Sequence, residues 1–206
     1  MSLAGKFIVL EGIDGAGKST HLGFIGEAVA RQKNVQVIQT REPGGTVLAE
    51  QIRELVLHQA MDVQTEVLLV SAARRDHVSR VILPALEAGH WVICDRFLDS
   101  TRAYQGGGGG ADLGWIDQIN ALSTEGLIPD RIYLFDAPAE LAAARRGHRG
   151  QATDRFEGHD VAYFERVRSV YLLGQQPAYA ARTLVIDASQ SVSQIQNILE
   201  TDISSL

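Results

Sequence analysis

A glycine-rich stretch near the N-terminus constrains the fold more than any other feature of the chain. Residues 12–19 have the pattern G-x-x-x-x-G-K-S, a short apolar run at residues 7–10 precedes them, and apolar residues at helical spacing follow them. A strand, a glycine-rich loop and a helix in this order are the context in which such a motif binds phosphate. The alternative is a glycine-rich turn that matches by chance, and the flanking strand and helix argue against it.

The chemistry of this loop follows from its backbone. Gly12, Gly15 and Gly17 allow successive N–H groups to point toward an anion, and the start of the following helix adds partial positive charge. Lys18 would bind the β- and γ-phosphates, and the Ser19 hydroxyl would be a ligand of Mg²⁺. We therefore predict a nucleoside triphosphate site formed by Gly12, Ile13, Asp14, Gly15, Ala16, Gly17, Lys18, Ser19 and Thr20.

Apolar runs and stretches of helical spacing alternate along the chain. The predicted strands are residues 6–10, 35–40, 91–95, 131–136 and 183–187, and the predicted helices are residues 22–31, 47–57, 66–87, 113–125, 139–146, 163–181 and 192–203. This alternation indicates an α/β fold of the P-loop NTPase type, with three layers and a five-stranded parallel sheet flanked by helices. We expect one domain over residues 1–206, a short lid at about 145–157, and a flexible loop at the glycines 106–110.

The composition limits the partners that the chain could bind. A formal net charge of −6 argues against a nucleic acid polymer or a membrane surface, which would favour a basic face. No apolar segment approaches the ~18 residues of a membrane span. The single cysteine, Cys94, cannot form an internal disulfide, which fits a reducing compartment. We expect a cytoplasmic protein.

Polar residues follow the predicted strands at their carboxyl ends, where ligands of parallel sheets collect. Asp95 ends the apolar run at 91–94 and is similar to a Walker-B carboxylate, which holds Mg²⁺ directly or through water. The alternative is a strand-end Asp that caps the next turn. Arg96, the next residue, would bind a second phosphate, and its place beside Asp95 in a chain with a phosphate loop favours this over the alternative of a solvated loop charge.

Arginines are concentrated in the region of the predicted lid. Arg145, Arg146, Arg149 and Arg155 fall within eleven positions, and Arg145 and Arg149 would share one face of a helix. In phosphoryl transfer such arginines stabilise the charge on the migrating group, and a closing segment excludes water. A solvated helix face is the alternative interpretation of this cluster.

Together these motifs resemble the bacterial thymidylate kinase family. The resemblance covers nearly the whole chain and is carried by residues 11–20, Thr40-Arg41-Glu42-Pro43-Gly44-Gly45-Thr46, Ala72-Ala73-Arg74, Asp95-Arg96-Phe97, Ser100-Thr101, Ala103-Tyr104-Gln105-Gly106 and Asp154-Arg155-Phe156-Glu157. It implies transfer of the γ-phosphoryl group of ATP to dTMP, giving dTDP and ADP, with Mg²⁺ as cofactor. It also implies a homodimer.

The resemblance assigns residues to the phosphate and the sugar of the acceptor nucleotide. Arg41 and Arg96 would hold the acceptor phosphate. Tyr104 would pack under the deoxyribose, and Asp14 would reach its 3′-hydroxyl. Arg53 matches another family position near the acceptor, with a surface helix charge as the alternative.

The resemblance also describes the pocket for the base. Arg74 would bind the edge of thymine, and Thr101 and Gln105 would complete the pocket. The family has a phenylalanine that stacks on thymine where this chain has Val70, and a lost stacking contact costs about 1–3 kcal/mol on the scale of single-stranded nucleic acids. The predicted acceptor site comprises Asp14, Arg41, Pro43, Arg53, Val70, Arg74, Arg96, Ser100, Thr101, Tyr104 and Gln105.

The source of the transition-state arginine is predicted from a difference within the family. Some members place it in the phosphate loop directly after the acid, where this chain has Gly15. The charge must then come from the lid, with Arg149 as the first choice and Arg145 as the second. The predicted catalytic residues are Lys18, Arg96, Arg149 and Arg145.

Two other functions are compatible with the loop. Val70, and Gly109 where many bacterial members carry a basic residue, leave open a kinase of another pyrimidine monophosphate or of a nucleoside. A P-loop regulatory module is the alternative of a different class. The chain has no Asn-Lys-x-Asp run of the kind that GTPases use for guanine, and a regulatory module would show no rate increase with an added monophosphate.

Overall fold

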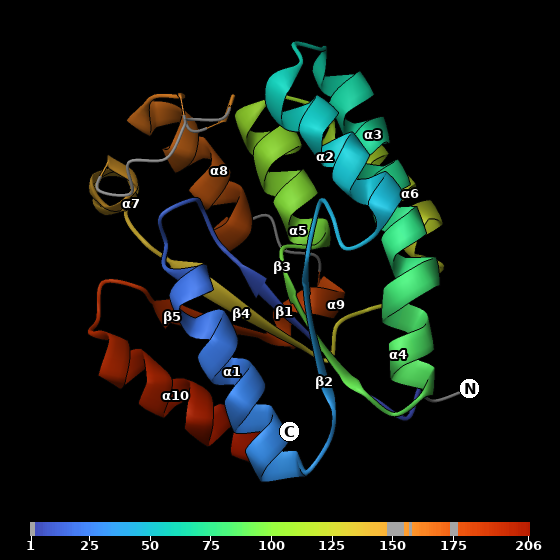
Figure 1. The fold of residues 1–206 in the computed structure, drawn as a ribbon. Coiled ribbons are helices and arrows are strands. Elements are labelled where there is room, and N and C mark those ends of the chain that lie inside the picture. Colours follow the sequence, from blue (N-terminus) through green and yellow to red (C-terminus); the bar gives the residue numbers. More distant parts are fainter. Residues whose placement is uncertain (1–2, 148–154, 157, 174–176) are drawn as a thin grey trace.

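Five parallel strands form the centre of the molecule (Figure 1). The structure is a computed structural model that describes residues 3–147, 155–156, 158–173 and 177–206. The sheet has the order β2-β3-β1-β4-β5 and consists of β1 (Phe7–Glu11), β2 (Val37–Arg41), β3 (Trp91–Asp95), β4 (Arg131–Asp136) and β5 (Thr183–Asp187). In register, Val9 of β1 lies between Cys94 of β3 and Ile132 of β4. The predicted fold class, an α/β fold with a five-stranded parallel sheet, is confirmed.

Helices cover both faces of the sheet because the side chains of each strand alternate between two faces. Ile8 and Leu10 pack in one core with α1 and α10, which lie side by side in Figure 1, and Phe7 and Val9 pack in another core with η1 and α4. The helices are α1 (Lys18–Lys33), α2 (Val47–His58), α3 (Val63–His77), η1 (Val78–Ile82), α4 (Leu83–Glu87), α5 (Leu98–Thr101), η2 (Arg102–Gly108), α6 (Leu113–Thr124), α7 (Ala139–Gly147), α8 (Val161–Leu173), α9 (Pro177–Ala180) and α10 (Val192–Ser205).

Side-chain caps explain where several of these helices begin. The Thr46 hydroxyl accepts a hydrogen bond from the Ala49 amide at 3.0 Å, at the first turn of α2. Asp62 caps α3 and Asp112 caps α6 in the same way, and Ser191 starts α10 with a capping box.

No helix in the described part of the chain has the length and apolar character that crossing a membrane requires.

One predicted helix differs from the structure, and another is described only in part. The helix predicted over 66–87 is present, but it begins at Val63 and passes through a π-helical turn, η1, before it continues as α4. Of the helix predicted over 163–181, the structure describes α8 and α9, and residues 174–176 between them lie outside the described part of the chain. The short helix α5 was not predicted, because it follows directly after the polar end of β3.

The prediction of a flexible loop at the five glycines is wrong for the first three of them. Gly106, Gly107 and Gly108 belong to the π-helix η2. A Cβ atom on Gly107 would lie 2.6 Å from a methyl group of Val170, and one on Gly108 would lie 2.5 Å from the ring of Tyr163. These glycines therefore allow α8 to pack closely against η2, the element that carries Tyr104 and Gln105.

Candidate active site

The phosphate loop occupies the turn between β1 and α1, as predicted. Gly12, Gly15 and Gly17 have φ angles of 135°, 89° and 100°, which other residue types rarely adopt. A Cβ atom on Gly12 would meet the carbonyl oxygen of Phe135, and one on Gly15 would meet that of Ala142. Glycine is thus required at positions 12 and 15 by both backbone angle and close packing, and at position 17 by backbone angle. Helix α1 begins directly after the loop, at Lys18.

The Lys18 ammonium lies inside the loop. The side chain is buried, and Nζ donates hydrogen bonds to the carbonyl oxygens of Gly12 at 2.8 Å and Ile13 at 3.3 Å. Burial and the neighbouring Arg96 charge lower the pKa of Lys18, while nearby carboxylates, including that of Asp14, act in the opposite direction. An anion bound in the loop would add to that opposing effect and favour the charged form of the lysine.

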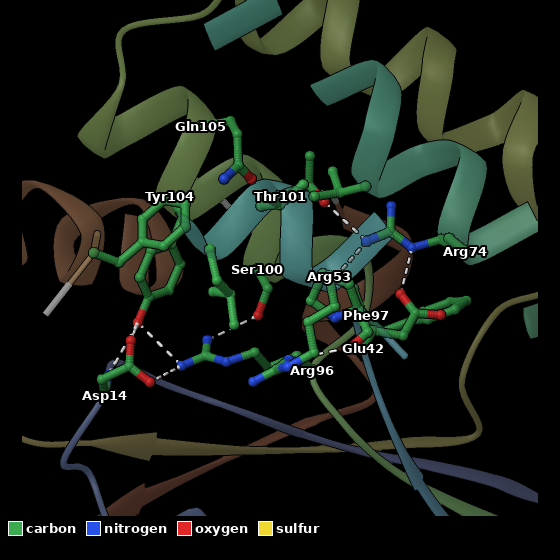
Figure 2. A pocket seen from close by; sticks show the side chains of 15 residues that line it. Asp14, Glu42, Arg53, Arg74, Arg96, Phe97, Ser100, Thr101, Tyr104 and Gln105 are labelled. Atoms are coloured by element: carbon green, nitrogen blue, oxygen red, sulfur yellow. Dashed lines mark hydrogen bonds and ion pairs between the residues drawn. The ribbon is translucent and has the colours of Figure 1, made fainter. Parts of the chain in front are cut away.

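An ion pair joins the phosphate loop to the end of β3. Nη2 of Arg96 donates to Oδ1 of Asp14 at 2.6 Å, and the Tyr104 hydroxyl donates to Oδ2 of Asp14 at 2.7 Å (Figure 2). Burial alone would raise the pKa of Asp14, but the Arg96 and Lys18 charges and these hydrogen bonds together hold that pKa below its usual range. Asp14 is therefore a carboxylate throughout the physiological pH range.

The backbone of Arg96 directs its side chain across the edge of the sheet. Arg96 has a φ of 74°, which is uncommon for a residue other than glycine, and its N–H donates to the Leu10 carbonyl at 2.9 Å. Its Nη1 donates to the hydroxyls of Ser100 and Tyr171, each at 3.1 Å. Such left-handed residues cost roughly 1–3 kcal/mol and concentrate at functional sites.

Glu11 organises the same region and was not predicted to have a role. Its carboxylate accepts hydrogen bonds from the Phe97 amide at 2.8 Å, the Ser100 hydroxyl at 2.6 Å and the Tyr171 hydroxyl at 3.1 Å. Burial raises the pKa of Glu11, and the hydrogen bond from Ser100 acts against this shift. The sequence feature that could have identified Glu11 is its position as an acidic residue at the end of an otherwise apolar strand.

A cavity opens beside this network at the carboxyl end of the sheet (Figure 2). The space inside it, together with the open solvent at its mouth, is about 650 Å³. Every residue of the predicted acceptor site lines it, with the exception of Arg41. The lining consists of Asp14, Glu42, Pro43, Arg53, Val56, Leu57, Val70, Arg74, Arg96, Phe97, Ser100, Thr101, Tyr104, Gln105 and Phe156.

Arg41 lies apart from the other predicted acceptor residues. It ends β2, where its Nη2 donates to Oε2 of Glu50 at 2.8 Å, and about half of its side chain is exposed. Glu50 also accepts a hydrogen bond from the Gly45 amide, so it links the side chain of Arg41 to the last residue of the same Arg-Glu-Pro-Gly-Gly run. The role of Arg41 at the acceptor phosphate stays a prediction.

The Arg74 guanidinium is fixed on the opposite side of the cavity from Asp14 (Figure 2). Nε donates to Glu42 at 2.7 Å, Nη1 to Asn120 at 2.8 Å and Nη2 to Thr101 at 2.8 Å. Because Arg74 is almost completely buried, these bonds hold it in one orientation. Glu42 and Asn120 are partners that the sequence did not reveal, because both lie far from Arg74 along the chain.

Arg53 and Gln105 also reach the cavity, and each is bonded to a neighbouring element. Nη1 of Arg53 donates to the Pro43 carbonyl at 3.1 Å, which ties α2 to the loop after β2. Nε2 of Gln105 donates to Oε1 of Glu66 at 2.6 Å, which ties η2 to α3. The side chains of the predicted acceptor site are thus oriented by bonds between elements.

A second cavity lies on the other side of the phosphate loop. It encloses about 580 Å³, including open space, and is lined by Gly15, Ala16, Gly17, Thr20, His21, Arg145, Ala188, Gln190, Val192 and Ile195. His21 was not predicted to have a role. Its ring stacks on that of Phe135 at 5.5 Å, and its buried Nδ1 has no hydrogen-bond partner among the described residues.

The predicted lid arginines have different surroundings. Nη2 of Arg145 donates to the Ala188 carbonyl at 3.0 Å, at the edge of the second cavity. Nη1 of Arg146 donates to the backbone carbonyl of Asp14 at 2.6 Å, a contact with the phosphate loop that was not predicted. Arg149, the first choice for the transition-state arginine, lies outside the described residues.

The predicted metal ligands fit Mg²⁺. Ser19 is exposed in the first turn of α1, directly after Lys18. Oδ1 of Asp95 is buried and has no hydrogen-bond partner in the described part of the chain. A buried oxygen without a donor is a suitable ligand for a cation, directly or through water, and Mg²⁺ prefers oxygen ligands.

Comparisons with known proteins agree with this geometry. The family model for thymidylate kinase matches residues 10–199. The chain is 47% identical over 205 residues to a thymidylate kinase of Cupriavidus pinatubonensis, covering 99% of this chain and 100% of that protein. It is 45% identical over 206 residues to one of Bordetella petrii, covering 100% and 98% of the two chains. The chain therefore belongs to the thymidylate kinase family.

Proposed function

We propose that this chain transfers the γ-phosphoryl group of ATP to the 5′-phosphate of dTMP, giving dTDP and ADP. The observation that carries the proposal is the ion pair between Asp14 and Arg96, which joins the phosphate loop to a cavity suited to a nucleotide. Membership of the thymidylate kinase family supports the same donor and acceptor. A donor in the loop and an acceptor in the cavity would meet above this pair.

The mechanism in this proposal is positioning and charge neutralisation. The acceptor phosphate is already anionic at neutral pH, so no residue has to act as a strong base. Lys18 and the loop amides would hold the donor phosphates, and Arg96 would hold the acceptor phosphate. Ser19 and Asp95 would hold Mg²⁺, which supplies positive charge to the donor phosphates when it is bound.

The second cavity is suited to the remainder of the donor nucleotide. It is separated from the acceptor cavity by the phosphate loop, and Arg145 lies at its edge. Arg145 would contribute positive charge near the donor, with Arg149 as the principal transition-state arginine. Arg146, bonded to the backbone of Asp14, would steady the loop between the two nucleotides.

The acceptor nucleotide would be held at its base and sugar by the predicted residues. Arg74 would bind the thymine edge from its fixed position, next to Thr101. Asp14 and Tyr104, already bonded to each other, would contact the deoxyribose. Gln105 would complete the base pocket.

An acceptor panel tests this function. ADP release from ATP would be measured with dTMP, dUMP, dCMP and dAMP, with the Lys18→Ala variant purified in parallel to exclude a contaminating kinase. We expect the highest kcat/KM with dTMP. A higher value with another pyrimidine monophosphate would favour the second candidate function, a kinase of that nucleotide, which Val70 leaves open. ADP release that no monophosphate accelerates would contradict both and favour a regulatory module.

The proposal extends to the organisation of the protein. The two cavities are lined by residues from Asp14 to Ile195, so we propose that the whole chain is one catalytic unit. We also propose a homodimer, because Leu68 of α3 and Leu122 of α6 are exposed on two helices that pack together. Light scattering of the purified protein in solution would then give twice the mass of one chain. A cytoplasmic location stays a prediction.

A further inference from the structure

The base pocket contains an aromatic ring that comes from a distant part of the chain. Phe156 lines the acceptor cavity together with Val70, the residue that stands where the family resemblance implies a stacking phenylalanine. Phe156 also packs against a small apolar cluster of α2 and α3, to which Val70 belongs. The cavity wall near Val70 is therefore aromatic, although position 70 is not.

The ring of Phe156 is oriented relative to a second ring of the cavity. Its centroid lies 6.0 Å from that of Tyr104, with an interplanar angle of 85°. The hydroxyl of Tyr104 is held by Asp14, which fixes one of the two rings. Two rings at right angles suit a nucleoside, because the planes of a sugar and its base are also steeply inclined to each other.

The neighbouring residue, Arg155, attaches Phe156 to the core. The Arg155 amide donates to the Leu57 carbonyl at 3.2 Å, and Nη2 donates to the Val56 carbonyl at 3.0 Å and to the Glu66 carboxylate. The Arg155 guanidinium also lies 4.8 Å from the Phe156 ring centroid. These contacts connect Phe156 with the end of α2 and with α3.

Glu66 links this attachment to the base pocket. Its carboxylate is nearly buried and is shared between Arg155 and Nε2 of Gln105, the latter at 2.6 Å. One side chain of α3 therefore fixes both the Gln105 amide that lines the cavity and the arginine next to the ring. A buried charge that bonds two partners in this way restricts the position of both.

We propose that Phe156 is the base-stacking residue of the acceptor site, and that the Arg155–Glu66 ion pair is the positioning element that holds it there. The ligand is a planar pyrimidine, which gains stacking energy from any aromatic face. The assignment rests on the proposed function and explains how a chain with Val70 binds thymine. Val70 then supplies only a small apolar wall.

The test compares dTMP with dihydrothymidine monophosphate. The saturated base of the analogue retains the hydrogen-bonding edge of thymine but is no longer aromatic. Wild-type protein should bind dTMP about tenfold more tightly than the analogue, as measured by calorimetry. Phe156→Leu should abolish this preference and raise KM for dTMP, while KM for ATP stays unchanged. Phe156→Tyr should retain the preference.

Two further variants separate stacking from general structure. Phe24→Leu makes the same change in α1, at a half-buried ring that lines neither cavity, and should leave the preference intact. Arg155→Gln, which removes the ion pair but leaves the Glu66–Gln105 bond, should weaken dTMP binding on its own but have little further effect in the Phe156→Leu background. The comparison of dTMP with the analogue in wild-type protein does not depend on whether Phe156→Leu folds well, so the assignment stays testable without that variant.

The possible outcomes distinguish this inference from the proposed function. If wild-type protein phosphorylates dTMP and Phe156→Leu retains the full preference for dTMP over the analogue, the stacking assignment is wrong and the proposed function stands. If wild-type protein does not phosphorylate dTMP, the proposed function itself fails. Equal binding of dTMP and the analogue by wild-type protein would also overturn the stacking assignment.

Discussion

Arg96, at the end of β3, and Asp14, in the phosphate loop, form an ion pair with 2.6 Å between Nη2 and Oδ1. This contact connects the phosphate loop with the acceptor cavity, because Asp14 belongs to the loop and also lines that cavity. Arg96 bonds Ser100 and Tyr171 with its other terminal nitrogen. Both terminal nitrogens of its guanidinium therefore donate hydrogen bonds.

Arg96→Lys should impair catalysis although it preserves the charge. A lysine ammonium cannot bridge Asp14 on one side and two hydroxyls on the other. We expect kcat/KM for dTMP to fall by about a hundredfold with KM for ATP nearly unchanged, as measured in steady-state assays. Arg131→Lys, in a pair with Asp202 away from both cavities, is the matched control and should retain activity. An active Arg96→Lys enzyme would exclude the proposed role of the fork.

Lys18→Ala should abolish turnover while the fold is retained. In the described part of the chain the ammonium bonds only loop carbonyls, so its removal breaks no hydrogen bond to another element. We expect kcat to fall at least about a thousandfold and Tm to change by no more than about 3 °C. Lys33→Ala, at the other end of α1, is the control and should be fully active. Normal turnover of Lys18→Ala would overturn the assignment of the phosphate loop.

Asp99 should make the protein less stable as the pH rises. Burial raises the pKa of Asp99 to about 7, and the charge of Glu11 adds to this effect. Between about pH 4 and pH 7 the native state therefore holds a proton that the unfolded chain has released, so the free energy of unfolding falls as the pH rises.

Asp99→Asn removes this titration. Relative to wild type, the variant should gain roughly 2 kcal/mol in the free energy of unfolding between about pH 5 and pH 8, as measured by urea denaturation. Taking the difference between the two proteins cancels the contribution of the other titrating groups. Parallel stability curves across this range would show that Asp99 does not titrate there.

Gly107→Ala should destabilise the packing of α8 on η2. The new methyl group would lie 2.6 Å from Val170 and 2.9 Å from the Arg166 carbonyl oxygen, and the backbone cannot move away easily. We expect a loss of about 2 kcal/mol in the free energy of unfolding. Gly23→Ala, at an exposed helical position with no atom within 4 Å of the new group, should instead add about 0.5–1 kcal/mol. Equal effects of the two changes would contradict the packing argument.

Features with a local signal could be predicted from the sequence. The phosphate loop is marked by its own glycines, and each strand by a short apolar run that ends in a polar residue such as Asp95 or Arg96. Because the carboxyl ends of parallel strands meet at one edge, these residues had to converge. Every member of the predicted acceptor set except Arg41 does lie in one cavity.

Features that depend on distant partners could not be predicted. Glu11 and Glu66 each bond residues far along the chain, and nothing in their neighbours reveals a pairing with Tyr171 or Arg155. The glycine run gave the wrong prediction because composition alone cannot tell a flexible loop from a helix that needs space. The glycines of η2 provide space for Tyr163 and Val170 of α8, and such tertiary contacts cannot be predicted from composition.

The central claim is direct phosphoryl transfer between two nucleotides that meet above Asp14 and Arg96. Its most direct test follows the fate of a radiolabel in the γ-phosphate of ATP when dTMP is added. The account predicts that the label appears in dTDP, in a quantity equal to the ADP formed and without inorganic phosphate. Label released as inorganic phosphate, or retained in ATP in the presence of dTMP, would contradict it.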